Sequence, residues 1–293
     1  MRRMSAEKRN ELARATYHHM QPRKIQFYSF PASKPTNQAA LLFIHGAYVK
    51  ASCWEINFIP FFQSRGFDCY SFDLSGHGNS EGRQQIDSFG IADYVNDLEL
   101  IVGKIEQEVI LVGHSMGARV VERFLENQQV AGAILLAPVP TTGTLGSAVQ
   151  LSQRFPNFID AIKYVTHHSE VTPELAEMLT KIYFSPSVTP AEALRFFPMV
   201  GPESQLAITE MAIPDMRFRV RRPRLPVLVM GGTEDAVFPA SMLHFVASPW
   251  HATVIRAPGA GHMLMLDHEW SVAAELIDSW LGKHFSSNNE NDR

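Results

Sequence analysis

The chain has 293 residues, of which 45% are hydrophobic and 19% are charged, and its formal net charge is −4. This composition is ordinary for a globular enzyme and excludes a mainly disordered chain. Without a basic surplus to bind phosphate backbones, nucleic acid is not expected as a partner.

The first twenty residues begin with basic side chains and hold no apolar stretch of the kind found in secretory signals. No run of 18 apolar residues occurs along the sequence, so no membrane-spanning helix is expected. The two cysteines, Cys53 and Cys69, form neither a metal motif nor a disulfide framework. We therefore expect a cytoplasmic protein with free thiols and no bound metal.

Short apolar runs alternate with longer amphipathic segments along most of the chain. Runs typical of buried strands occupy residues 24–30, 39–44, 67–72, 109–112, 131–136, 227–230 and 253–256. Helical patterns occupy residues 54–65, 89–107, 116–128, 240–247 and 268–284. This alternation predicts an α/β fold with a mostly parallel, doubly wound sheet and helices on both faces.

One segment, residues 139–214, interrupts this alternation, because it contains helix-like pieces rich in Pro, Met and Phe but no clear buried strand. We interpret it as a helical cap inserted over the strand ends, called the insertion below. The core domain would then be discontinuous, formed by residues 1–138 and 215–293. Most apolar residues of the insertion should pack on the core, and some should line an apolar pocket.

The pentapeptide GHSMG, residues 113–117, follows a predicted strand and precedes a predicted helix. A G-x-S-x-G sequence in this context is typical of a nucleophile elbow, a tight turn that lifts the serine clear of the sheet. The N-terminus of the following helix would favour developing negative charge. These features predict that Ser115 is a nucleophile.

A serine hydroxyl needs an adjacent base that is oriented by a carboxylate. His262 is the candidate base, because it lies in a Gly-rich loop after the last predicted strand, where open α/β sheets place reactive groups. Asp235, just after strand 227–230, is the candidate acid, and Glu234 is its alternative. The chain order Ser115, Asp235, His262 is the order expected with an elbow serine.

Acyl transfer also requires backbone N–H groups that face the developing oxyanion. The amide of Met116, directly after the nucleophile, is predicted to be one of them. The other is predicted at Ala47, in the loop after strand 39–44, because Gly46 permits a close turn that would aim the next amide inward.

Other polar residues near these motifs are expected to be structural. His45 and His77 lie in turns flanked by glycine, where ring nitrogens commonly form loop hydrogen bonds. His114 occupies the variable position of the elbow and should pack beside it. Asp267 follows His262 too closely to come from a separate strand end.

The spaced motifs resemble those of the α/β-hydrolase superfamily, at residues 45–47, 73–82, 113–117, 231–235 and 261–262. The stretch GHGNSEG is similar to that of monoacylglycerol lipases and lysophospholipases, and the loop at 45–47 to that of small carboxylesterases. Ala118 stands where many relatives have a second glycine. The resemblance implies an α/β-hydrolase fold with a cap after the sixth core strand. Because the elbow holds a serine, dehalogenases and epoxide hydrolases with a carboxylate nucleophile are not expected.

The residues and the resemblance together predict a carboxylesterase- or lipase-like hydrolase that works through an acyl-enzyme and needs no cofactor. Its partners would be water and a small ester with an apolar acyl or aromatic group. A C–C bond hydrolase, a lactonase or a capped peptidase with the same triad is the alternative. A non-catalytic small-molecule binder on this fold is the alternative from a different class.

Overall fold

The computed structural model describes residues 23–34, 39–168, 171–215 and 224–285, so the N-terminal residues on which the expectation about a signal depends lie outside it. A seven-stranded sheet in the order β1-β3-β2-β4-β5-β6-β7 forms the centre. The strands are β1 (Phe27–Phe30), β2 (Ala40–Ile44), β3 (Cys69–Phe72), β4 (Val109–His114), β5 (Gly132–Leu136), β6 (Val227–Gly232) and β7 (Thr253–Ala257). Only the pairing of β1 with β3 is antiparallel among these strands, which confirms the predicted, mostly parallel sheet.

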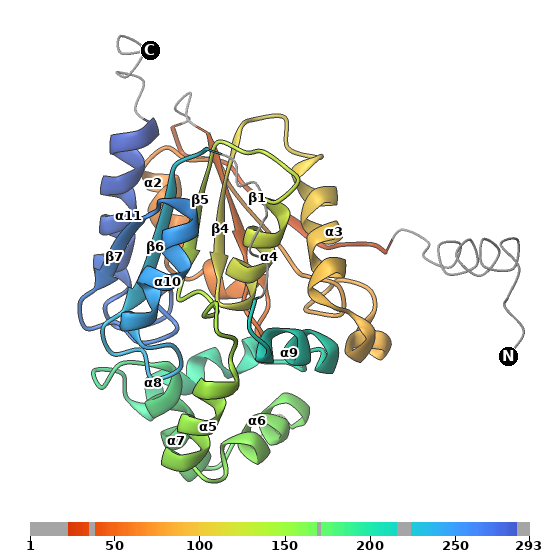
Figure 1. Ribbon diagram of the computed structural model, residues 1–293, viewed down its shortest axis with the longest axis vertical. Coiled ribbons are helices and arrows are strands. Elements are labelled where there is room, and N and C mark those ends of the chain that lie inside the picture. Colours follow the sequence, from red (N-terminus) through yellow and green to blue (C-terminus); the bar gives the residue numbers. More distant parts are fainter. Residues whose placement is uncertain (1–22, 35–38, 169–170, 216–223, 286–293) are drawn as a thin grey trace, which may run out of the picture.

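Helices cover both faces of the sheet (Figure 1). One face carries α3 (Ile91–Val102), α4 (Met116–Phe124) and α10 (Leu243–Ala247). The other carries α2 (Phe58–Ser64) and α11 (Trp270–Phe285). Short 3-10 helices join these elements at η1 (Ala51–Trp54), η2 (Arg83–Ser88), η4 (Ala240–Met242) and η5 (Ser248–Trp250).

Strand β2 explains why the sheet is covered on both sides. Its side chains alternate between two apolar cores, with Leu42 and Ile44 in one and Leu41 and Phe43 in the other. All four are fully buried. A strand that is apolar on both faces requires a helical layer on each side, as in other parallel sheets.

Between β5 and β6 the chain forms the helices of the insertion, which gather at one end of the sheet (Figure 1). These are α5 (Leu145–Arg154), α6 (Phe158–His167), α7 (Pro173–Tyr183), α8 (Pro190–Ala193), η3 (Leu194–Met199) and α9 (Gln205–Ala212). Thr172 caps α7 by accepting from the amide of Leu175, and Pro173 occupies the first turn, where its missing N–H has no cost.

Along the described chain, the insertion lies between β5 and β6. Five strands, β1 to β5, precede it in the described residues. Because residues 1–22 lie outside the described part, the expected place after the sixth core strand stays a prediction. The division into a core of residues 1–138 and 215–293 and a cap of residues 139–214 stays a prediction.

Arg119 of α4 contacts both ends of the insertion. Its guanidinium donates to the carbonyl oxygens of Val139 (3.3 Å) and Pro140 (3.1 Å), where the chain leaves β5. It also donates to the Asp215 carboxylate at 2.6 Å, where the insertion ends. Arg119 is 5% exposed, so this charged contact holds both connections from within the protein.

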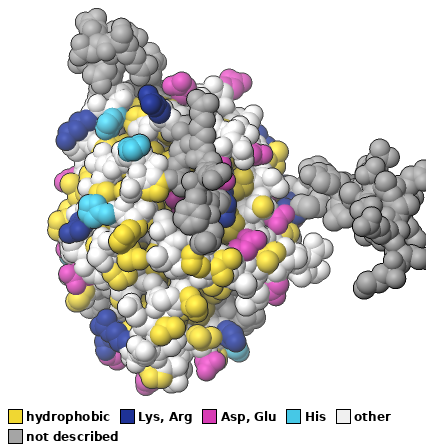
Figure 2. All heavy atoms as spheres, in the orientation of Figure 1, with side chains coloured by type: hydrophobic (Ala, Val, Ile, Leu, Met, Phe, Trp, Pro, Cys, Tyr) yellow, Lys and Arg dark blue, Asp and Glu magenta, His cyan; other side chains and the backbone are white. Residues whose placement is uncertain are grey.

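The surface of the insertion is rich in apolar side chains. Seven of the ten large hydrophobic residues that stay exposed in the described chain belong to it, namely Leu145, Val149, Ile159, Tyr164, Leu194, Leu206 and Ile213. In the same orientation, Figure 2 shows many apolar side chains over this end of the visible face, among interspersed acidic and basic ones. None of the described helices combines the length and the hydropathy that crossing a bilayer requires.

The contact between α4 and the end of β2 yields a stability prediction. Gly117→Ala should lower the free energy of unfolding by about 1–3 kcal/mol, because the added Cβ would overlap the backbone oxygens of Ile44 and His45. Gly146→Ala in α5 is the matched control, since no heavy atom lies within 4 Å of its added Cβ. Urea denaturation followed by circular dichroism measures both, and equal midpoints for the two variants would contradict the prediction.

Candidate active site

The predicted site residues lie in loops that follow the carboxyl ends of neighbouring strands. Ser115 follows β4, Asp235 follows β6 and His262 follows β7. Ala47 follows β2, and Ile44 at the end of β2 pairs with Gly113 at the elbow. Because parallel strands end at the same edge of the sheet, residues distant in the sequence meet there.

The elbow holds Ser115 in a strained backbone conformation, with φ 52° and ψ −113°. Its amide donates to the carbonyl oxygen of Leu136 at 2.9 Å. A Cβ at Gly113 would lie 2.5 Å from the carbonyl oxygen of Gly117, so only glycine fits there. Strain of this kind persists where close packing over-determines the backbone, as it does at functional sites.

Ser115, His262 and Asp235 form one hydrogen-bonded chain. His262 Nε2 lies 3.2 Å from Ser115 Oγ, and His262 Nδ1 lies 2.9 Å from Asp235 Oδ2. The other carboxylate oxygen, Asp235 Oδ1, accepts from the amides of Val237 and Phe238, both at 2.8 Å. Since the carboxylate accepts at Nδ1, that nitrogen carries the proton and Nε2 is directed at the serine hydroxyl as an acceptor.

Glu234, the alternative acid, does not reach the histidine. It is exposed, and its contact with the His262 loop is through its backbone amide, which donates to the carbonyl oxygen of Ala260 at 2.9 Å. The structure therefore brings Asp235, and not Glu234, against His262.

His114 and Asp267 hold the His262 loop, although neither is part of the hydrogen-bonded chain. His114 Nε2 donates to the carbonyl oxygen of His262 at 2.9 Å, and burial lowers the pKa of His114 well below its ordinary value, which keeps the ring neutral. Asp267 Oδ2 accepts from the amides of Gly261 (3.1 Å) and Ser185 (2.8 Å). Asp267 thus joins the His262 loop to the insertion.

The two predicted oxyanion donors lie beside Ser115. Gly46 packs against the serine so closely that a Cβ there would be 3.2 Å from Ser115 Cβ, and Ala47 and Ser115 line the same cavity. Met116 begins α4. Within the described residues, neither the Ala47 amide nor the Met116 amide has a hydrogen-bond acceptor. Both amides are thus available to a ligand.

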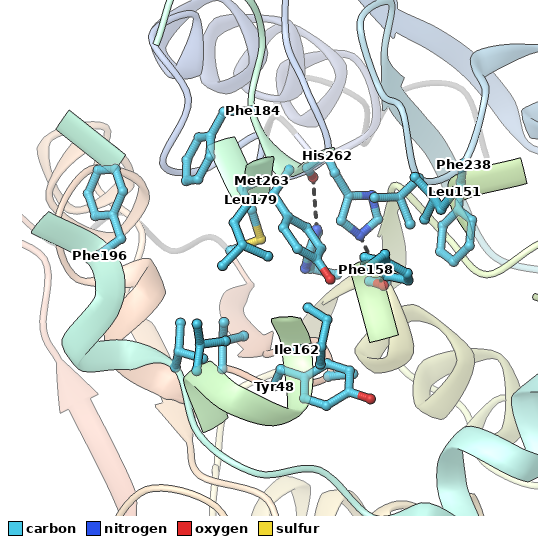
Figure 3. Close-up of a pocket in the computed structure, with 18 of the residues that line it drawn as sticks. Tyr48, Leu151, Phe158, Ile162, Leu179, Phe184, Phe196, Phe238, His262 and Met263 are labelled. Carbon is cyan, nitrogen blue, oxygen red and sulfur yellow. Dashed lines mark hydrogen bonds between the residues drawn. The ribbon is translucent and has the colours of Figure 1, made fainter. Parts of the chain in front are cut away.

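A cavity of about 240 Å³ opens beside Ser115 and His262. Figure 3 shows apolar side chains on several sides of His262, and most of them come from the insertion. They include Leu151, Phe158, Ile162, Leu179, Phe184 and Phe196. No Asp, Glu, Lys or Arg of the described chain lines this cavity, so it suits an uncharged, apolar group.

A buried charged pair lies behind the Ala47 loop, and sequence reasoning missed it. His77 Nε2 lies 3.0 Å from Glu203 Oε2, and the side chains are 2% and 0% exposed. Burial opposes both charges, but the carboxylate of Glu203 raises the pKa of His77 above its ordinary value, and the His77 charge lowers the pKa of Glu203. Together with burial, the neighbouring His77 lowers the pKa of His45 to about 4, so His45 is neutral.

His45 holds the turns around it, as its glycine-flanked position suggested. Its Nδ1–H donates to the carbonyl oxygen of Gly46 at 2.8 Å, and its Nε2 accepts from the amide of Leu74 at 3.1 Å. In the described part of the chain, no group of three or more His, Cys, Asp or Glu side chains is arranged to hold a metal ion.

The sequence also matches a known family. The family model described as "Alpha/beta hydrolase family" matches residues 41–274 of the sequence, which is most of the chain. The chain therefore belongs to the alpha/beta hydrolase family, as its motifs indicated. A Mycoplasma pneumoniae protein whose name calls it an esterase/lipase is 28% identical over 120 residues. That match spans 40% of this chain and 44% of the relative, less than half its length.

Several solved structures share the fold over most of their length. A bromoperoxidase from Bacillus anthracis has a TM-score of 0.69 and 20% identity, covering 89% of this chain and 96% of that one. A thermophilic esterase from Thermogutta terrifontis has a TM-score of 0.67 and 19% identity, and the match covers 92% of this chain and 97% of that one. A soluble variant of Saccharomyces cerevisiae monoglyceride lipase has a TM-score of 0.69 and 18% identity, and the match covers 92% of this chain and 95% of that one. At such identities the likeness shows the fold alone.

The charged pair predicts a pH-dependent contribution to stability. The raised pKa of His77 means that its contribution is complete below its ordinary value of 6.5 and is lost as pH rises through the folded-state pKa. The lowered pKa of Glu203 means that its contribution is present above its ordinary value of 4.5 and is lost as pH falls through the folded-state pKa. The pair should therefore stabilise the fold most between pH 4.5 and 6.5.

This dependence can be measured as the difference in free energy of unfolding between the natural chain and His77→Gln across pH 4 to 9. Taking the difference cancels the titration of distant groups. We expect a maximum between the two ordinary pKa values, a decline as pH rises through the folded-state pKa of His77, and the onset of a decline below pH 4.5. A difference that stays constant across this range would show that the pair is not charged.

Proposed function

We propose that the protein hydrolyses carboxylic esters through an acyl-enzyme, with Ser115 as nucleophile, His262 as base and Asp235 as orienting acid. The observation that carries this proposal is the continuous chain of hydrogen bonds from Asp235 through His262 to Ser115. Such a chain at a strained elbow is the arrangement that activates a serine hydroxyl in hydrolases on several folds.

In the first half of the reaction, Ser115 Oγ attacks the acyl carbon while His262 Nε2 takes the hydroxyl proton. The imidazolium that forms is stabilised by Asp235 and then gives its proton to the leaving alcohol. In the second half, water loses a proton to His262 and attacks the acyl-enzyme, and Ser115 recovers its proton as the acid departs. Atoms and charge balance with water alone, so the reaction draws on no cofactor.

The amides of Met116 and Ala47 would hold the oxyanion of both tetrahedral intermediates. Their position beside Ser115 and the lack of an acceptor for them in the described residues support this role. The helix that starts at Met116 adds a favourable dipole. Preorganised donors of this kind are usually a large part of the catalytic effect.

The substrate proposed for this site is a small, uncharged ester with an apolar acyl or aromatic group. The apolar lining of the cavity supports it, and so do the esterase, lipase and monoglyceride lipase named among the similar proteins. Residues 139–214 would act as the cap that shapes this cavity. A cytoplasmic location stays a prediction, which the two free, buried cysteines support.

Three substitutions test the catalytic assignment. Ser115→Ala should lower kcat by about 10⁶-fold, since loss of the nucleophile removes the acylation step. Asp235→Asn should lower it by about 10⁴-fold by favouring the wrong tautomer of His262. Glu234→Gln is the matched control and should leave kcat unchanged, because its carboxylate does not contact His262.

A fluorophosphonate probe gives a readout that does not depend on knowing the substrate. We expect stoichiometric labelling of the natural chain and none of Ser115→Ala. A folded natural chain that is not labelled would favour a non-catalytic binder instead. Near-normal ester hydrolysis by Ser115→Ala would disprove the assignment of the nucleophile.

The apolar cavity predicts a dependence on acyl chain length. With straight-chain aryl esters, each added methylene should raise kcat/KM by up to about fourfold, which corresponds to burying about 0.8 kcal/mol per CH₂, until the cavity is filled. An acyl chain of equal length that ends in a carboxylate should be a poor substrate, because no cation lines the described cavity. A flat profile, or a preference for the charged ester, would contradict this substrate class.

Parallel assays with lactones, amides and vinylogous diketones rank the other bonds that such a triad can cleave.

A further inference from the structure

Tyr48, the residue after the proposed oxyanion donor Ala47, has an unusual backbone conformation. Its φ is 64°, in the left-handed region that residues with a side chain rarely adopt. Tyr48 also lines the cavity, where its ring lies below His262 in Figure 3. A conformation of this kind costs free energy and is kept only where the surroundings hold it.

The insertion supplies the groups that hold Tyr48. The amide of Gly201 donates to the carbonyl oxygen of Tyr48 at 2.9 Å. The amide of Tyr48 in turn donates to Glu203 Oε2 at 3.3 Å. Both backbone polar groups of this residue are therefore paired with one short segment, residues 201–203, that precedes α9.

Glu203 is itself held from several elements. Its Oε2 also accepts from His77 Nε2, and its Oε1 accepts from the hydroxyl of Tyr94 at 2.9 Å and the amide of Ser204 at 2.7 Å. All four partners are donors, so a charged carboxylate satisfies each of them, whereas a neutral amide would present its NH₂ to some of them.

The positive charge of His77 balances the negative charge of the buried Glu203 carboxylate. Its Nδ1 lies 3.1 Å from the carbonyl oxygen of Ser75, and its Nε2 lies against Glu203. Because both ring nitrogens face acceptors, both carry protons and the ring is an imidazolium. A fully buried carboxylate with this many partners is a rigid anchor, and removing it would leave several buried donors unpaired.

We propose that Glu203 is a positioning residue for acyl transfer. Together with Gly201, it holds Tyr48 in the left-handed conformation and thereby keeps the Ala47 amide directed at the oxygen that becomes negatively charged. This inference rests on the proposed function, since it concerns the oxyanion donor of the same site. The insertion then takes part in catalysis as well as in forming the cavity.

The test compares Glu203→Ala with Glu210→Ala. Glu210 is the matched control, because it also lies in the insertion and accepts from a core amide, that of Ile91 at 2.7 Å, but it does not contact Tyr48. The readouts are kcat and KM for a short-chain aryl ester, and the inhibition constant of an alkyl trifluoromethyl ketone. This ketone forms a tetrahedral adduct with serine that carries an oxyanion.

We expect Glu203→Ala to lower kcat by about 10- to 100-fold, less than the loss of about 10²- to 10³-fold when an oxyanion donor is removed outright. The ketone should bind more weakly by a similar factor, while KM changes by less than kcat, because the donor acts mainly in the transition state. Glu210→Ala should keep both quantities within about twofold of the natural chain.

Thermal unfolding checks that each variant is folded. If Glu203→Ala does not fold, Glu203→Gln serves instead, since it keeps the size of the side chain and should shift the readouts in the same direction. Folded Glu203 variants with unchanged kcat and ketone affinity would overturn the inference and leave the proposed function intact. Equal losses in Glu210→Ala would also overturn it. A natural chain that neither hydrolyses esters nor reacts with the ketone would overturn both.

Discussion

The close approach of three backbone segments at the elbow is the constraint on which the rest of the site depends. The end of β2, the end of β4 and the start of α4 meet around Gly46, Gly113 and Gly117, where an added Cβ would overlap neighbouring atoms. This packing forces Ser115 into a conformation that no regular element provides. It also places Ala47 of the β2 loop beside the serine, so the same contact positions the proposed nucleophile and the proposed oxyanion donor.

The insertion is joined to the core by buried polar contacts as well as by apolar packing. Arg119 binds both of its ends, Glu203 binds the loops after β2 and β3, and Asp267 binds Ser185 to the His262 loop. Burying such groups is costly unless every partner is satisfied, and here each makes several hydrogen bonds. The position of the insertion is therefore coupled to both sides of the site.

Sequence reasoning recovered most of the fold, because its signals are local. The apolar run at 39–44 became β2 (Ala40–Ile44), and the helical period at 89–107 became the shorter α3 (Ile91–Val102). The predicted runs at 109–112 and 227–230 end two residues before β4 and β6 do. The last residues of these strands, such as His114 and Gly232, belong to the elbow and loop motifs and so do not continue the apolar pattern.

The sequence by itself determined the α/β class, the family and the candidates Ser115, Asp235 and His262, because each stands in a short motif next to a strand whose pattern is visible. Only the tertiary structure showed that Asp235, and not Glu234, lies against His262, because adjacent residues differ in side-chain direction and not in sequence context. It alone revealed Glu203, which lies 126 positions from His77 in the sequence. No local pattern marks a carboxylate whose partners come from separate loops, since only folding brings them together.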